Sequence, residues 1–110
     1  MKVTLDRINE NYLFEAKGPN NIQVSVDSKL GGDVKGASPM ELLLMAVGGC
    51  NAIDIISILK KQRQEVSSYK IEVDGKQKET GGAKPFEAIH LTIFLEGEIV
   101  AEKAKKAAEL

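Results

Sequence analysis

The feature that most constrains this chain is a helix-length segment, residues 42–59, that is apolar on almost every side. Its polar residues, Asn51, Asp54 and Ser57, recur at every third position. A helix that is apolar all round must be covered by protein over most of its surface. The chain has 110 residues, enough for one small domain, and offers little further material for that cover. We therefore expect a homodimer in which a second copy covers part of the helix.

The start of this helix is marked by Ser38-Pro39-Met40-Glu41. Ser38 suits the N-cap position, and proline suits the first helical position. Glu41 stands three residues after Ser38, which is the spacing of a capping box. The helix is predicted to continue to about Arg63. Two interpretations of Glu41 stay open: a capping residue, or a catalytic carboxylate that orients an arginine.

The remaining segments predict an α+β fold in one domain over residues 1–110. Three short segments of alternating polar and apolar residues precede the helix as strands, at residues 3–8, 12–16 and 22–26. Two longer strands follow it, at residues 69–78 and 89–95, and form an antiparallel hairpin across a loop at 79–85. A last helix begins near Glu98 and reaches Leu110 without a capping residue. We expect that this C-terminus is truncated.

Composition excludes several classes of partner. Fifteen Lys and Arg nearly balance sixteen Asp and Glu, so there is no charge excess to favour nucleic acid or an anionic membrane surface. Aromatic residues make up 5% and tryptophan is absent. The N-terminus lacks the pattern of a signal peptide. A membrane-spanning helix needs roughly 18 uninterrupted apolar residues, and the polar residues of the central helix interrupt the longest candidate. We expect a cytoplasmic protein with no nucleic-acid or membrane partner.

Cys50 is the single cysteine and lies in the middle of the apolar helix. It cannot form an internal disulfide, so it is either a small core residue or a nucleophile. On a helical wheel Asp54 lies about 40° from Cys50 and Ser57 about 20° away, while Ile55 and Leu59 lie on the far side. A reactive thiolate needs a nearby cation or a helix N-terminus. Such a cation would have to come from elsewhere in the fold or from a partner.

Two glycines, Gly48 and Gly49, directly precede the cysteine. Each costs a helix about 1 kcal/mol relative to alanine. We interpret both as positions that allow another backbone to approach closely, for example the equivalent helix of a second copy.

Other chemistry-bearing residues are sparse. His90, the single histidine, lies in a strand segment with apolar neighbours, and is either a structural residue or the imidazole of a thiol–imidazole pair. One Cys and one His are too few for a zinc site, so no metal is expected. The glycines at 31, 32 and 36 do not form a phosphate-binding pattern, so no cofactor is expected either.

The segment from Ala37 to Lys61 resembles the OsmC/Ohr family, and within it the YhfA-type branch with its pattern SPMExxLMAxGGCxAxDxxxIL. The order of strands and helices along the whole chain is similar as well. The resemblance implies an OsmC-like fold: a strand-swapped, intertwined dimer whose central helices pack between the sheets. In such a dimer the active sites lie at the interface.

The characterised members of this family are thiol peroxidases that reduce organic hydroperoxides in the oxidative-stress response. By resemblance, Cys50 would be the peroxidatic cysteine that becomes a sulfenic acid, and Glu41 would be the second catalytic residue. The implied partners are a small hydroperoxide and a thiol reductant. The 110 residues contain no second cysteine to resolve the sulfenic acid, so turnover would need an external thiol or a C-terminal segment that this chain lacks.

The sequence departs from the peroxidase pattern in two further respects. The loop from Ser28 to Lys35 has lysines but no arginine, and Met40 stands where the acidic residue of the peroxidases directly follows the proline. Glu41 comes one position later. These departures favour an alternative function, a non-enzymatic homodimer that binds a small apolar or electrophilic ligand in its interface pocket.

Overall fold

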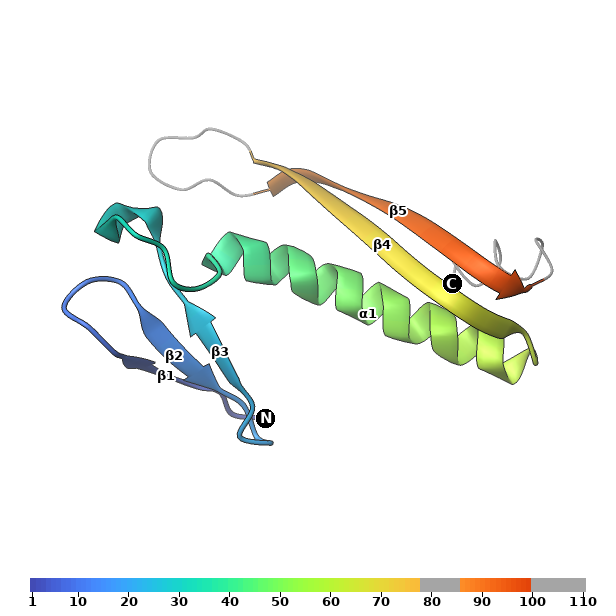
Figure 1. Cartoon of the computed structure of the whole chain (residues 1–110), viewed down its shortest axis with the longest axis horizontal. Coiled ribbons are helices and arrows are strands. Elements are labelled where there is room, and N and C mark those ends of the chain that lie inside the picture. The colour runs from blue at the N-terminus through green and yellow to red at the C-terminus, as the bar shows by residue number, and fades with distance from the viewer. Residues whose placement is uncertain (78–85, 100–110) are drawn as a thin grey trace. The chain divides into compact units, whose positions relative to one another are not determined.

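A computed structural model describes residues 1–77 and 86–99 of the chain, in which strands β1 to β3 precede one long helix and strands β4 and β5 follow it (Figure 1). The chain divides into two compact units, Met1–Leu43 and Leu44–Leu110. The predicted loop at 79–85 and the predicted last helix lie outside the described residues. The interpretation of residues 1–110 as one domain stays a prediction. The α+β fold with a central helix and two sheets is confirmed.

The first unit contains a three-stranded antiparallel sheet of β1 (Thr4–Arg7), β2 (Phe14–Lys17) and β3 (Gln23–Val26). The strands are one or two residues shorter than the alternating pattern predicts. Their register aligns Leu5 with Ala16 and Ala16 with Val24, which places these apolar residues on one face of the sheet. Leu5 and Val24 are exposed within this chain.

The long helix α1 spans Pro39–Lys61. Its predicted capping box is confirmed: the Ser38 N–H donates to Glu41 Oε2 at 2.7 Å, and the Glu41 N–H donates to Ser38 Oγ at 3.2 Å. The helix ends two residues before the predicted Arg63. Arg63 instead takes a left-handed conformation, with φ 57°, and the Gln64 N–H closes the end by donating to the Leu59 carbonyl.

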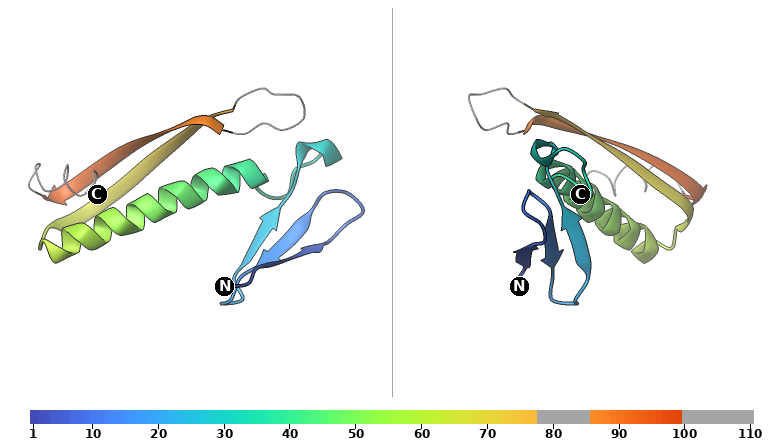
Figure 2. Two further views of the ribbon diagram at one scale, coloured as in Figure 1. Left: turned by 180° about the vertical axis from the view of Figure 1, so that it is seen from behind. Right: turned by 60° about the vertical axis from the view of Figure 1, so that its left-hand side comes forward.

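The second unit pairs α1 with a long antiparallel hairpin of β4 (Glu65–Gln77) and β5 (Phe86–Glu98), visible from two sides in Figure 2. Its core is formed by Ile55 and Leu59 of the helix. The residues packed around them are Ile58, Val66, Tyr69, Ile93, Leu95 and Ile99. Both strands are longer than predicted, because pairing between them extends through charged residues such as Glu65 and Glu98 whose propensity for strands is low.

The length and apolar character of α1 bear on whether this helix could cross a membrane. By length and composition the helix could cross a membrane, but the core helix of a soluble protein meets the same criteria. Here α1 packs against β4 and β5 with Ile55 and Leu59 buried against the sheet, and 17% of its apolar window is buried within the chain.

Candidate functional site

The thiol of Cys50 is exposed, in the middle of α1. The residues of α1 that are buried are Gly48, Ile55 and Leu59, which lie on the side of the helix that packs against β4 and β5. Cys50 therefore lies on the side away from that sheet, as the helical wheel predicts. The interpretation of Cys50 as a core residue of its own chain is wrong.

The helix surface around the thiol is apolar and open. Ala46, Gly49, Cys50 and Ile53 are all exposed, and we call these four residues the thiol face of α1. Ile53 is 68% exposed, a large value for an isoleucine in the centre of a long helix. An exposed apolar patch of this kind is typical of a surface that another molecule covers.

The two glycines before the cysteine have different structural roles. A Cβ on Gly48 would lie 2.8 Å from Val73 Cγ2, so Gly48 is required by the close approach of the chain's own β4. The close approach predicted at Gly48 is therefore made by the chain's own β4 and not by a second copy. A Cβ on Gly49 would meet no atom within 4 Å. Gly49 alone remains open to a partner.

The polar residues near the thiol are not equivalent either. Asp54 and Ser57 are exposed on the same side of the helix as Cys50. Asn51 is half-buried, and its side-chain amide donates to the Val47 carbonyl at 2.9 Å. Of the three polar residues in the apolar segment, Asp54 and Ser57 thus share the side of Cys50, while Asn51 bonds to its own helix.

The second predicted catalytic residue, Glu41, is exposed in the first turn of α1, nine residues before Cys50. Its carboxylate accepts the Ser38 N–H in the capping box. Because this bond uses one carboxylate oxygen, the other remains available to a second donor. A catalytic role of Glu41 stays a prediction.

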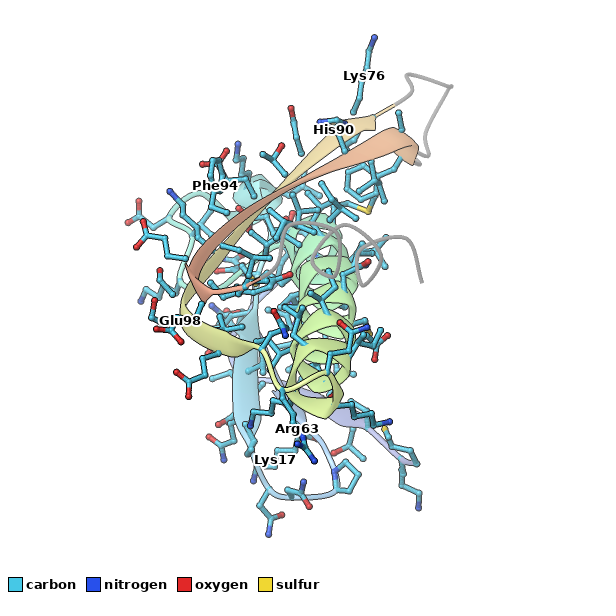
Figure 3. All side chains as sticks on the ribbon, turned by 90° about the vertical axis from the view of Figure 1, so that its right-hand side faces the viewer. Lys17, Arg63, Lys76, His90, Phe94 and Glu98 are labelled. Carbon is cyan, nitrogen blue, oxygen red and sulfur yellow. The ribbon has the colours of Figure 1, made fainter. Side chains whose placement is uncertain are left out.

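His90 does not approach the thiol within the second unit. It is exposed on β5, directly opposite Asp74 of β4. Its neighbours Leu91 and Ile93 alternate with it along the strand, and Ile93 packs against the helix, so His90 points to the other side of the sheet (Figure 3). The structure therefore brings together no thiol–imidazole pair in this unit.

Each of the two arginines of this chain lies at or beside the end of a strand or helix, where the backbone turns. The Arg7 guanidinium at the end of β1 donates to the carbonyls of Glu10 and Asn11, the latter at 3.0 Å. Arg63 directly follows the last turn of α1. Arg7 is therefore already engaged by backbone oxygens of its own turn.

Sequence reasoning missed one buried acidic residue, Asp27, which is 5% exposed at the end of β3. Hydrogen bonds from the backbone N–H groups of Lys35 and then Ser28 lower the pKa of its carboxyl group. Its position in the sequence could have indicated this role. Asp27 lies between a strand of alternating polar and apolar residues and a glycine-rich loop, where aspartate commonly accepts hydrogen bonds from backbone N–H groups.

The chain has an α+β fold built on one long helix, and its single thiol is exposed at the centre of that helix. These features define the class of protein: a thiol-bearing protein whose candidate site lies on a helix face. The family model for OsmC-like proteins matches residues 30–110. The chain belongs to the OsmC-like protein family, which confirms the resemblance seen in the sequence.

Relatives of known sequence or structure agree with this assignment. Protein YhfA of Escherichia coli strain K12 is 34% identical over 95 residues, which cover 86% of this chain and 69% of that protein. A hypothetical protein from Aquifex aeolicus VF5 has a crystal structure that superposes with a TM-score of 0.85 at 31% identity, covering 98% of this chain and 75% of that one.

A more distant neighbour shares the fold alone. This Psychrobacter arcticus 273-4 protein, named for osmotic stress induction and a detoxification response, superposes with a TM-score of 0.83 at 14% identity. The match covers 99% of this chain and 80% of that one.

Proposed function

We propose that this protein is a cytoplasmic, homodimeric redox protein that reduces organic hydroperoxides through Cys50 in the oxidative-stress response. The observation that carries the proposal is the exposure of Cys50 on the side of α1 that its own sheet leaves open. A thiol on that side can contribute to a site at the proposed dimer interface, whereas a thiol that served as core filling of its own chain would face Ile55 and Leu59. Membership of the OsmC-like family supports the same chemistry.

The proposed reaction uses an external thiol as its reductant. The Cys50 thiolate attacks the distal oxygen of the hydroperoxide, the O–O bond breaks, and the alcohol leaves with one proton, so the thiol is oxidised to a sulfenic acid. A small thiol then attacks this sulfur and releases water, forming a mixed disulfide. A second thiol molecule regenerates Cys50 and leaves as the oxidised disulfide.

The proposed homodimer rests on apolar surface left exposed in both units. In the second unit it is the thiol face of α1. In the first unit, Leu5 is 54% exposed and Val24 is 40% exposed on the apolar face of the three-stranded sheet. Two separate apolar surfaces on so small a chain are expected to be covered, and a second copy is the partner that we propose.

A non-enzymatic alternative is favoured by the lack of an arginine in the loop from Ser28 to Lys35. Arg7, in another turn, already donates to backbone carbonyls of that turn. In this alternative the homodimer binds a small apolar or electrophilic molecule beside Cys50, and the cysteine lines the pocket without turning over.

The test compares two thiols on the same side of the helix. One variant is Cys50→Ser, and the matched control is the double variant Cys50→Ser with Ser57→Cys, which moves the thiol to another exposed position. We expect wild type alone to consume cumene hydroperoxide with dithiothreitol as reductant. Equal peroxide consumption by the control, or no consumption by wild type, would favour the ligand-binding alternative.

A further inference from the structure

We propose that Asp27 is a latch that holds the loop of residues 28–36 closed against the end of β3, and that this loop opens as a unit when the latch is broken. Asp27 and the loop both belong to the first unit, and the latch is independent of the chemistry proposed for Cys50. The Asp27 carboxylate is buried and takes no part in the proposed reaction.

The Asp27 carboxylate spans the loop from one end to the other. Its Oδ1 accepts the N–H of Ser28 at 2.7 Å, and its Oδ2 accepts the N–H of Lys35, eight residues away, at 2.9 Å. Both bonds are charge-assisted, so they are stronger than bonds between neutral groups. One side chain thereby ties the first residue of the loop to its penultimate residue.

Backbone contacts at the base of the loop fit this closed arrangement. The Asp27 N–H donates to the Ala37 carbonyl at 2.9 Å, and the Ala37 N–H donates to the Ser25 carbonyl at 3.0 Å. A Cβ on Gly36 would lie 2.6 Å from the same Ser25 carbonyl oxygen, so this position admits only glycine. The end of the loop is therefore seated directly on β3.

The rest of the loop has few contacts to keep it in place, one of them at Gly31, where a Cβ would lie 3.2 Å from Asn11 Cβ and 3.3 Å from Tyr12 Cδ2. Leu30 is 80% exposed and Val34 is 47% exposed, so neither apolar side chain anchors the loop in this chain. The internal structure is one short 3-10 helix, η1 (Lys29–Gly31), held by local bonds from Leu30, Gly31 and Gly32. A segment with so few buried contacts opens at low free-energy cost once its closing bonds are lost.

Limited trypsin digestion tests the latch, because the loop carries two cleavage sites, Lys29 and Lys35. In Asp27→Asn an amide replaces the carboxylate, and its NH₂ group cannot accept the second N–H. We expect cleavage after Lys29 and Lys35 to be about tenfold faster or more, which corresponds to a tenfold larger open population. The matched control is Asp33→Asn, which removes the same charge from an exposed position in the same loop.

A second measurement covers the case in which Asp27→Asn does not fold. In wild-type protein, the Lys35 amide should exchange with deuterium more slowly than the Val34 amide, and the Ser28 amide should share its protection. Equal cleavage of the two variants with unchanged thermal unfolding would overturn the proposal. Unprotected Ser28 and Lys35 amides in wild type would overturn it as well.

Discussion

The hydroxyl of Tyr69 illustrates how single residues limit the stability of the second unit. It is one of two buried side-chain polar atoms without a hydrogen-bond partner among the described residues; the other is Gln62 Oε1. Burial raises the pKa of the Tyr69 phenol, because the phenolate loses contact with water. The ring packs on Ile55 and Leu59, so its apolar part stabilises the core while its hydroxyl does not.

This arrangement predicts a loss of stability in alkali. The pKa of the Tyr69 phenol is higher in the folded state than in the unfolded state, where it is about 10. The protonated phenol therefore contributes its full stabilisation of the folded state at a pH below the unfolded-state pKa. This contribution is lost as the pH rises through the folded-state pKa. In urea unfolding from about pH 8 to about pH 11, Tyr69→Phe should therefore lose less stability than wild type. Tyr12→Phe, which retains Tyr69, should behave like wild type. Parallel falls in Tyr69→Phe and wild type would contradict the prediction.

At the scale of elements, the two glycines of α1 predict opposite effects of one added methyl group. Gly48→Ala places a Cβ against Val73, a stiff side chain in β4, and overpacking of this kind costs about 1–3 kcal/mol. The gain in helix propensity, about 1 kcal/mol, offsets part of it. We expect a lower free energy of unfolding for Gly48→Ala in urea. In Gly49→Ala the methyl meets no atom of the chain, so no such loss is expected; equal losses would refute this assignment of the glycines.

Helix α1 also shows how much of the fold can be predicted from sequence. The capping box at Ser38 and Glu41 and the placement of Cys50 opposite Ile55 and Leu59 depend on local spacing, and the structure confirms both. The role of Gly48 could not be predicted, because it depends on Val73, a residue twenty-five positions later that only the packed sheet brings near. Asp27 was missed for the same reason, since its partner N–H at Lys35 is set by the closed loop.

At the scale of the whole molecule, the proposed dimer predicts that a charge on the thiol face disrupts association. Ile53→Glu replaces an exposed apolar side chain with a carboxylate that cannot be buried without a partner. Thr92→Glu, on the opposite side of the β4–β5 sheet, introduces the same charge elsewhere. Sedimentation equilibrium should show dimers for wild type and Thr92→Glu, and mainly monomers for Ile53→Glu. A dimer that survives Ile53→Glu would place the interface on another surface.

The most direct test of the central claim, that Cys50 reduces organic hydroperoxides, is a single turnover without reductant. Wild-type protein mixed with one equivalent of cumene hydroperoxide should gain the mass of one oxygen atom at Cys50 and release one equivalent of cumyl alcohol, as the sulfenic acid chemistry requires. Cys50→Ser should do neither. The account would be contradicted if wild type gained no oxygen at Cys50, or if Cys50→Ser produced the alcohol equally fast.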